Sequence, residues 1–264
     1  MGESSMSESL TKTAVVTGAG SGIGAACARR FIGGGWNVVL NYFGEGLRPA
    51  AEAIASEAEA GGVRTILVDG DVTIDADCRR IAAEAAEDLG RIDALINCAG
   101  NTRIVPHADL EALTAEDFHS LYAVNTIGPF QMIRACAPHL KATGDAAVVN
   151  IASIAGVNGS GSSIAYAASK GALNTLTLSL ARVLGPAIRI NSICPALVEQ
   201  GFVHRLDPVR FEQHKAVQVE RSPLKRVGQP AEVAETVFWV ATGSPLMTGK
   251  IIELDCGLHL STTI

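Results

Sequence analysis

Short apolar runs alternate with longer helix-like segments along nearly the whole of this 264-residue chain, and this alternation constrains the fold more than any other feature. Apolar residues in the short runs are almost continuous, as in strands that are covered on both faces of a sheet. The expected strands lie at 13–16, 37–40, 65–68, 94–96, 147–150, 189–193 and 251–254. The expected helices lie at 22–32, 47–59, 76–89, 115–140, 163–184 and 231–240.

Strand–helix alternation of this kind predicts an α/β fold with a doubly wound, seven-stranded parallel sheet flanked by helices on both faces. The length suits one α/β domain, expected at 12–264 after a disordered N-terminal tail at 1–11. Because ligands of such sheets bind at the carboxyl ends of the strands, functional residues are expected there.

Charge and composition argue against several classes of function. The net charge is −6, from 21 basic and 27 acidic residues without a basic block, so nucleic acid is not an expected partner. No apolar run approaches the ~18 residues of a membrane span, so no membrane association is expected. None of the six cysteines forms a Cys-x-x-Cys pair, which argues against a metal site and fits reduced thiols in the cytoplasm. The polar first twelve residues lack the apolar core of a signal peptide.

A glycine-rich stretch, Thr-Gly-Ala-Gly-Ser-Gly-Ile-Gly at 17–24, follows the first expected strand and opens the first helix. Glycines let a pyrophosphate approach the backbone amides, and the helix N-terminus offers free N–H groups. The alternative is a glycine-rich turn that binds nothing. We expect dinucleotide contacts from Gly18, Ser21, Gly22, Ile23 and Gly24.

The ends of the second and third strands suggest which dinucleotide binds. Folds that prefer NAD usually place a carboxylate after the second strand, whereas Asn41 and Tyr42 stand here, and neither would repel a 2′-phosphate. NADP is therefore the expected cofactor, with NAD as the alternative. Arg48 is either a phosphate partner or a solvated residue at a helix start. After the third strand, Asp71 and Val72 are expected to contact adenine, while Thr73 or Asp75 could equally cap the next helix.

Two further polar positions lie near the middle of the chain. The fourth strand ends in Asn97, Cys98, Ala99 and Gly100, small residues that let the backbone pass under a cofactor. Asn125 stands inside an expected apolar helix and is followed by Gly128 and Pro129. This pattern predicts a local break that frees backbone groups, or merely an interrupted helix.

Tyr166 and Lys170 are four residues apart in an expected helix and therefore share one face. Lowering a phenol pKa from ~10 to ~7 requires roughly 4 kcal/mol. An ammonium ~5 Å away at an effective dielectric of ~20 supplies roughly 3 kcal/mol. Lys170 is thus expected to be nearly sufficient to activate Tyr166. Ser153 ends the fifth strand and is expected to bind a substrate carbonyl oxygen. A solvated helix face and a turn-stabilising serine are the alternatives.

These motifs together resemble the short-chain dehydrogenase/reductase family in its single-domain branch of about 250 residues, over essentially the whole chain. The motifs are TGAGSGIG at 17–24, NCAG at 97–100, Asn125, Ser153 and YAASK at 166–170. The resemblance implies a Rossmann-type fold and reversible hydride transfer between a nicotinamide and a small carbonyl or secondary alcohol.

The resemblance also implies roles for individual residues. Tyr166 would be the general acid/base, Lys170 would lower its pKa and bind the nicotinamide ribose, and Ser153 would hold the substrate oxygen. Asn125 would anchor a water linking Lys170 to solvent. Asn97, Ala99 and Gly100 would contact the cofactor, as would Pro195, Ala196 and Val198 on the nicotinamide side.

The chain departs from the family pattern in several places. Cys98 replaces the second residue of the usual NNAG, Ala196 replaces a glycine, and Gln200 falls near a usual threonine. Ser21 stands where many NADP-using relatives have arginine, which weakens the expectation of NADP.

Residues 196–226 interrupt the alternation and are expected to form a substrate lid. Its cations His204, Arg205 and Arg210 either meet an anionic substrate or are solvated loop charges. Segment 221–241 resembles 3-oxoacyl-thioester reductases and sugar or polyol dehydrogenases alike, and family likeness implies a homotetramer or dimer. The competing hypothesis is a dinucleotide-binding sensor or scaffold that has lost catalysis.

Overall fold

The computed structural model describes residues 11–261, so positions 1–10 of the tail expected at 1–11 lie outside the described residues. Seven parallel strands form one sheet in the order β3-β2-β1-β4-β5-β6-β7. The strands are β1 (Thr13–Val16), β2 (Asn37–Tyr42), β3 (Thr65–Asp69), β4 (Ala94–Asn97), β5 (Ala146–Ile151), β6 (Ile188–Pro195) and β7 (Ile251–Leu254). The predicted doubly wound parallel sheet is confirmed, and each predicted strand is present with its ends moved by at most two residues.

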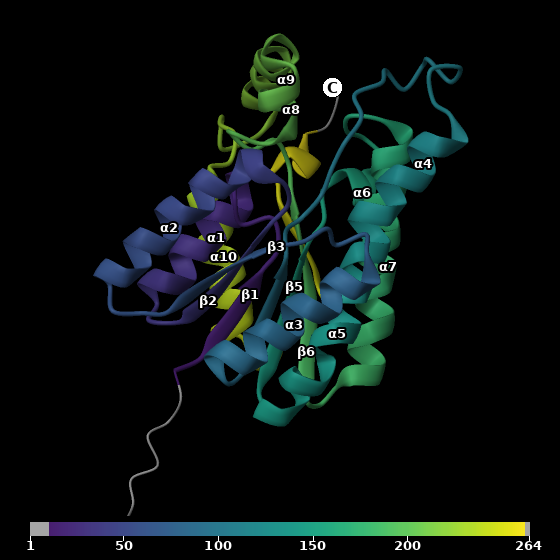
Figure 1. Cartoon of the computed structure of the whole chain (residues 1–264). Helices are drawn as coiled ribbons and strands as arrows, with labels where there is room; N and C mark the ends of the chain where they lie inside the picture. Colours follow the sequence, from purple (N-terminus) through teal and green to yellow (C-terminus); the bar gives the residue numbers. More distant parts are fainter. Residues whose placement is uncertain (1–10, 262–264) are drawn as a thin grey trace, which may run out of the picture.

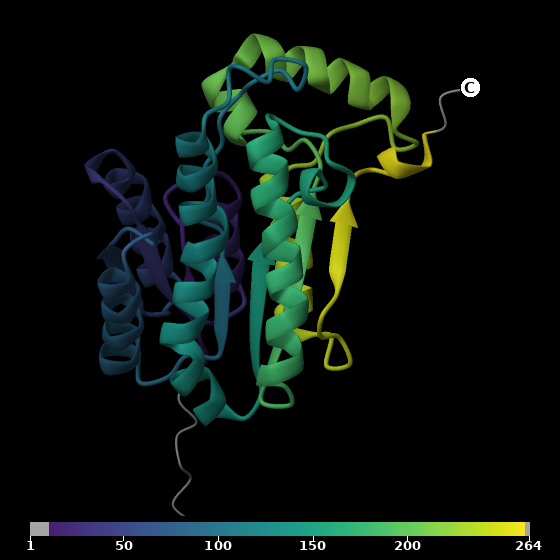
Figure 2. The same ribbon diagram turned by 90° about the vertical axis from the view of Figure 1, so that its right-hand side faces the viewer.

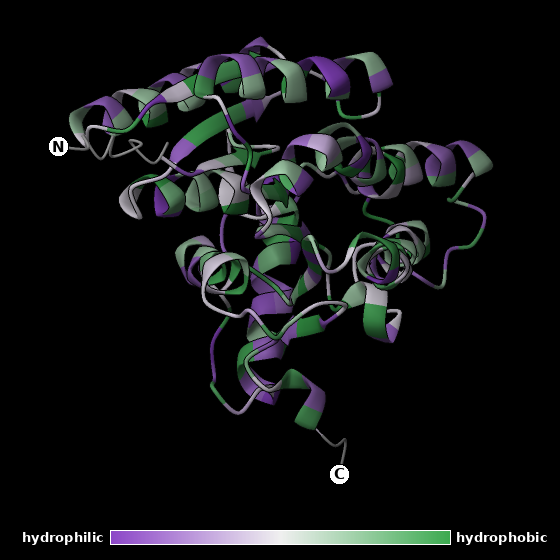
Figure 3. Ribbon diagram, turned by 90° about the horizontal axis from the view of Figure 1, so that it is seen from below, coloured by the Kyte–Doolittle hydropathy of each residue, from purple (hydrophilic) through white to green (hydrophobic). Residues whose placement is uncertain are grey.

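Helices cover both faces of the sheet (Figure 1). One face carries α1 (Gly22–Gly33), α2 (Arg48–Ala60) and α10 (Pro230–Thr242), and the other carries α3 (Asp75–Leu89), α5 (Gly128–Thr143) and α7 (Ile164–Leu184). A shorter helix, α4 (Ala115–Tyr122), packs against α7. Figure 3 shows hydrophilic and hydrophobic residues alternating along the helices, as expected of helices with one face on a sheet and one in solvent.

The sheet separates two apolar cores. Neighbouring residues of β1 point in opposite directions, so Val16 joins Phe31 of α1 in one core and Val15 joins Met132 of α5 in the other. All four side chains are fully buried. This two-sided burial explains why the strands read as continuous apolar runs in the sequence.

The helix predicted at 115–140 is interrupted. Between α4 and α5 the chain forms a π-helical turn, η2 (Ala123–Ile127), which contains Asn125. Gly128 and Pro129 then begin α5. The predicted break is therefore a widened turn, in which the backbone changes its hydrogen-bonding period without ending the helix.

Three helices in the remaining loops were not predicted as separate elements. They are α6 (Ala155–Asn158), α8 (Phe202–Leu206) and α9 (Pro208–Arg221), accompanied by the 3₁₀ turns η1 (Glu45–Leu47) and η3 (Leu258–Leu260). Figure 2 shows α9 crossing above the carboxyl ends of the strands. The segment predicted as a lid therefore lies over the edge of the sheet where ligands of this fold bind.

Candidate active site

A cavity of about 880 Å³ lies at the carboxyl ends of the strands. It is bounded by the glycine-rich loop, the segments that follow β2 to β6, the start of α7, and the helices α8 and α9. The strand order reverses between β4 and β2 on either side of β1, so the cavity occupies the topological switch point of the sheet.

The glycine-rich loop is shaped for a close approach of backbone to ligand. A Cβ added at Gly24 would lie 2.1 Å from the Gly18 carbonyl oxygen, and one at Gly18 would lie 2.9 Å from the Ala99 Cα. Gly18 also has a φ of 66°, which a residue with a Cβ rarely adopts. No side chain caps the N-terminus of α1 at Ser21. The first amides of this helix therefore face the cavity as free donors and fit a dinucleotide pyrophosphate.

The end of β2 places Asn41, but not Tyr42, against the cavity. The Asn41 side chain is buried and donates to the carbonyl of Gly70 at 3.0 Å. Tyr42 is buried among the strands, and the next residue, Phe43, lines the cavity instead with 64 % of its surface exposed. Arg48 pairs with Glu52 at 2.9 Å in solvent and does not line the cavity. Tyr42 therefore does not reach the cavity, and of the two alternatives for Arg48 the structure favours the solvated residue at a helix start.

Asp71 and Val72 line the cavity beyond β3. Asp71 accepts from the Thr73 amide at 2.8 Å, and Val72 is buried. Neither Thr73 nor Asp75 caps α3, whose N-cap residue is Ile74 without a side-chain hydrogen bond.

The floor of the cavity follows β4. Cys98, Ala99 and Gly100 line it, whereas Asn97 lies below and donates to the Asn150 side chain at 2.9 Å. Burial raises the pKa of the Cys98 thiol to about 12, so this thiol stays protonated. A Cβ at Gly100 would lie 3.1 Å from Asn125 Oδ1 and 3.6 Å from Lys170 Nζ, so only a very small residue fits there.

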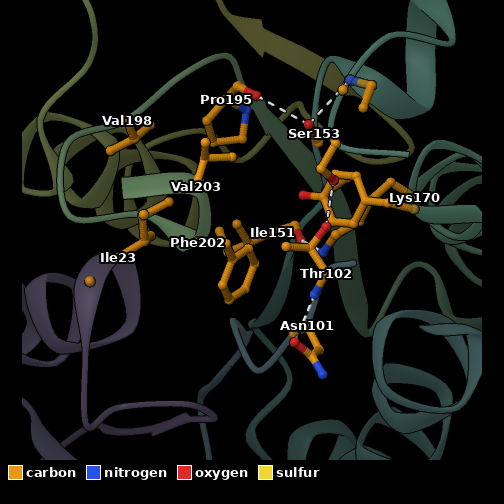
Figure 4. A pocket seen from close by; sticks show the side chains of 18 of the residues that line it. Ile23, Asn101, Thr102, Ile151, Ser153, Lys170, Pro195, Val198, Phe202 and Val203 are labelled. Carbon is orange, nitrogen blue, oxygen red and sulfur yellow. Dashed lines mark hydrogen bonds between the residues drawn. The ribbon is translucent and has the colours of Figure 1, made fainter. Parts of the chain in front are cut away.

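Ser153 and Lys170 point into one side of the cavity (Figure 4). Tyr166 lines the same cavity and forms a side-chain hydrogen bond with Ser153. The Ser163 hydroxyl caps α7 by accepting from the Tyr166 amide at 3.2 Å, which fixes the helix start beside the tyrosine. The Lys170 ammonium lies 5.9 Å from the Tyr166 ring centre and donates to the Ile151 carbonyl at 2.8 Å. Ser153 follows β5, and its hydroxyl accepts from the Ala155 amide at 3.1 Å. A hydrogen bond from Ser153 favours the ionised form of Tyr166.

Burial dominates the protonation of this group. It raises the pKa of Tyr166 to about 12 and lowers the pKa of Lys170 to about 8. Lys170 is therefore not nearly sufficient to bring the pKa of Tyr166 close to 7 in this structure, contrary to the expectation. The reason is that burial penalises the charged form of both side chains, and the ammonium is directed at a backbone carbonyl.

Asn125 does not line the cavity. Its amide group donates to the Asn101 carbonyl at 2.9 Å and to Ser169 Oγ at 3.0 Å, while its oxygen accepts from the Asn101 amide at 2.9 Å. It thereby joins the segment after β4 to α7 at the level of Lys170.

Pro195, Ala196 and Val198 line the cavity where β6 passes into segment 196–226, and the Pro195 carbonyl oxygen lies 3.5 Å from Ser153 Oγ. Of the lid cations, Arg205 lines the cavity and donates to Ser21 Oγ at 2.7 Å. His204 stacks on Phe211 with ring centres 4.4 Å apart, and His204 and Arg210 do not line the cavity. Nothing in the sequence pattern predicted the long-range contact of Arg205. The same holds for Thr102 and Ser162, whose hydroxyls hydrogen-bond each other at the cavity.

Within residues 11–261, no group of three or more His, Cys, Asp or Glu side chains is arranged to hold a metal ion. In the same range, no helix is long and apolar enough to span a membrane.

Comparison with known proteins agrees with this geometry. A family model described as enoyl-(acyl carrier protein) reductase matches residues 18–259. The putative ketoacyl reductase 2 of granaticin polyketide synthase from Streptomyces violaceoruber is 39 % identical over 248 residues, 94 % of this chain and 96 % of the relative. A 3-oxoacyl-[acyl-carrier-protein] reductase from Staphylococcus epidermidis is 28 % identical over 95 % of this chain and its own full length.

A solved structure extends the likeness to three dimensions. A putative short-chain dehydrogenase/reductase from Burkholderia xenovorans is 44 % identical, covers 96 % of this chain and 100 % of its own, and has a TM-score of 0.89. The chain belongs to the short-chain dehydrogenase/reductase family and is an NAD(P)-dependent oxidoreductase that acts on CH–OH groups.

Proposed function

We propose that this protein reduces the ketone of a small 3-oxoacyl thioester, with NADPH as the preferred cofactor. The observation that carries the proposal is that Tyr166, Ser153 and Lys170 line the same cavity as an uncapped helix N-terminus. The glycine-rich loop would hold the pyrophosphate, and Lys170 the nicotinamide ribose. When bound, the nicotinamide supplies the hydride.

The protein's own residues would handle the proton. A pKa of about 12 keeps the Tyr166 phenol protonated at neutral pH, which is the form that can donate to a substrate oxygen. The alkoxide oxygen formed by reduction is a much stronger base than a phenolate, so transfer from Tyr166 is downhill. The Ser153 hydroxyl, beside the phenol, would hold the carbonyl oxygen in place. Reduction therefore suits this arrangement better than oxidation, which needs the phenolate as a base.

The preference for NADPH is supported by the end of β2, where no carboxylate faces the cavity to repel a 2′-phosphate. The thioester class is supported by four apolar side chains that segment 196–226 brings to the cavity among polar ones such as Arg205 and Arg221, namely Leu197, Phe202, Val203 and Val217. A sugar or polyol would instead require polar partners for several hydroxyls. The names of the two ketoacyl reductase relatives point the same way.

We further propose that residues 196–226 act as a substrate lid and that the enzyme is a cytoplasmic homo-oligomer, either a tetramer or a dimer. Support for association comes from exposed apolar side chains near the C-terminal end of the fold, where Leu246 in the loop before β7 is 97 % exposed and Trp239 of α10 is 52 % exposed. Six free cysteines in the sequence fit a reducing compartment.

A substrate panel tests the proposal. Short 3-oxoacyl thioesters, simple ketones, sugars and polyols are assayed with both reduced and both oxidised nicotinamide cofactors, by nicotinamide absorbance. The expected result is fastest turnover of a 3-oxoacyl thioester with NADPH. Cofactor binding without turnover of any compound would support the sensor or scaffold instead.

A further inference from the structure

The lid and the glycine-rich loop are joined by one side-chain contact between residues 184 positions apart. The Arg205 guanidinium on α8 donates to Ser21 Oγ at 2.7 Å, and both residues line the cavity. Ser21 is the N-cap residue of α1, so the guanidinium stands beside the uncapped amides of that helix. A positive side chain and free amide donors therefore meet at one point of the cavity.

Arg205 is a cation without an acidic partner. Across residues 11–261, no carboxylate forms an ion pair with it. The two acidic side chains nearest to it in sequence are engaged elsewhere. Glu199 pairs with Lys215 at 2.7 Å, and Asp207 caps α9 by accepting from the Arg210 amide at 2.9 Å. The remaining polar contact of the guanidinium is a neutral hydroxyl, which a charged ligand oxygen would outcompete.

The position of Arg205 indicates which phosphate group of a dinucleotide it could contact, the pyrophosphate or the 2′-phosphate. The guanidinium lies 2.7 Å from Ser21 Oγ, in the loop that joins β1 to α1. A 2′-phosphate would instead lie past the end of β2, near Asn41 and Phe43. The pyrophosphate of a dinucleotide lies at the N-terminus of the first helix in such folds, where Arg205 is found.

We propose that Arg205 is a cofactor-binding residue that leaves Ser21 and binds the pyrophosphate of the dinucleotide, so that cofactor binding holds the lid closed. The inference rests on the proposed cofactor site and adds a residue from the lid to it. A pyrophosphate is common to NADPH and NADH, so Arg205 contributes equally to the affinity for both. It therefore does not determine the choice between them.

Calorimetric titration of the wild type, Arg205→Gln and Arg205→Lys with NADPH and with NADH tests this inference. Arg205 is exposed, so its substitution leaves the core intact. For Arg205→Gln, the dissociation constants of both cofactors are expected to rise about tenfold, or about 1.4 kcal/mol. Arg205→Lys should recover part of the loss. Affinity of the wild type should also fall more steeply with added NaCl than that of Arg205→Gln.

Arg210→Gln is the matched control, because Arg210 is a cation of the same lid that does not line the cavity. It should bind both cofactors as the wild type does. Unchanged affinity of Arg205→Gln for both cofactors would overturn the inference. A loss confined to NADPH would also overturn it, because the guanidinium would then serve the 2′-phosphate. If the wild type bound neither cofactor, the proposed function itself would fail.

Discussion

Burial favours the neutral form of both Tyr166 and Lys170, and these two pKa shifts determine the chemistry of the site. The phenol pKa rises to about 12, while the ammonium pKa falls to about 8. Lys170 is only 3 % exposed, and its polar contact is a backbone carbonyl. Lys170 is therefore still protonated at pH 7, although its pKa of about 8 is close to that pH. Tyr166 keeps its proton and can act as an acid.

The lowered pKa of Lys170 predicts a pH-dependent contribution to stability. Between pH 8 and pH 10.5 the unfolded chain holds a proton on Lys170 that the folded protein has released, so stability rises with pH in that window. Below pH 8 both states hold the proton, and the full cost of burying the charge applies. The free energy of unfolding of the wild type relative to Lys170→Met should rise by about 2 kcal/mol from pH 7 to pH 10.

Urea unfolding of both proteins at the two pH values measures this difference. Comparison with Lys170→Met removes the contribution of the buried thiols, whose raised pKa values lower stability above pH 9 in both proteins. If the difference in the free energy of unfolding between the two proteins stayed constant with pH, burial would not destabilise the charged form of Lys170.

The direction and the pKa of individual side chains could not be predicted from the sequence. The residue types at the strand ends predicted where the cavity would lie, but not that Tyr42 would be a buried last residue of β2 or that Phe43 would line the cavity. In a strand, each added residue reverses the direction of the side chain. The pKa values could not be predicted either, because desolvation depends on neighbours distant in the sequence.

At the scale of elements, the short helix α6 positions α7 and its side chains Tyr166 and Lys170. Gly156 of α6 lies against the backbone of α7, and a Cβ there would lie 2.5 Å from the Lys170 carbonyl carbon and 2.6 Å from the Gly171 amide nitrogen. These are backbone atoms, so the clash could be relieved only by separating the two helices. The close packing at Gly156 therefore sets the position of Lys170 relative to Ser153.

Gly156→Ala is expected to reduce turnover at least about tenfold and to destabilise the fold by about 1–3 kcal/mol, because overpacking moves α6 away from α7. Gly171→Ala is the control from the opposite side of the same junction, since its Cβ would make an ordinary contact of 3.4 Å with the Gly156 carbonyl oxygen. Steady-state kinetics and thermal unfolding measure both effects. Wild-type turnover in Gly156→Ala would refute the positioning role of this junction.

The elements with strong apolar periodicity were predicted almost to their ends, whereas irregular elements were not. Asn125, Gly128 and Pro129 signalled a break in the predicted helix 115–140, but not that the break would be a π-helical turn. The lid was predicted from the loss of alternation. Its division into α8 and α9 depends on the cap at Asp207, and its contact with Ser21 depends on the tertiary fold.

At the scale of the whole molecule, cofactor binding should stabilise the fold, because the cavity joins the glycine-rich loop, five strand ends and the lid. With no carboxylate facing the cavity after β2, NADPH is expected to raise the thermal unfolding midpoint more than an equal concentration of NADH. The difference between the midpoints with NADPH and with NADH should become smaller as salt is added, because the higher affinity for NADPH comes from the charge of its 2′-phosphate. Thermal denaturation measures this, and an equal or reversed effect at low salt would contradict the preference for NADPH.

The central claim is that Tyr166 delivers the proton to the substrate and contributes little to holding the cofactor. The most direct test measures hydride transfer and NADPH affinity side by side in Tyr166→Phe, which removes only the hydroxyl. We predict that turnover of a 3-oxoacyl thioester falls about 10²–10⁴-fold while the NADPH dissociation constant stays within about twofold of the wild type. Retained turnover, or a loss of activity explained entirely by lost NADPH binding, would contradict the account.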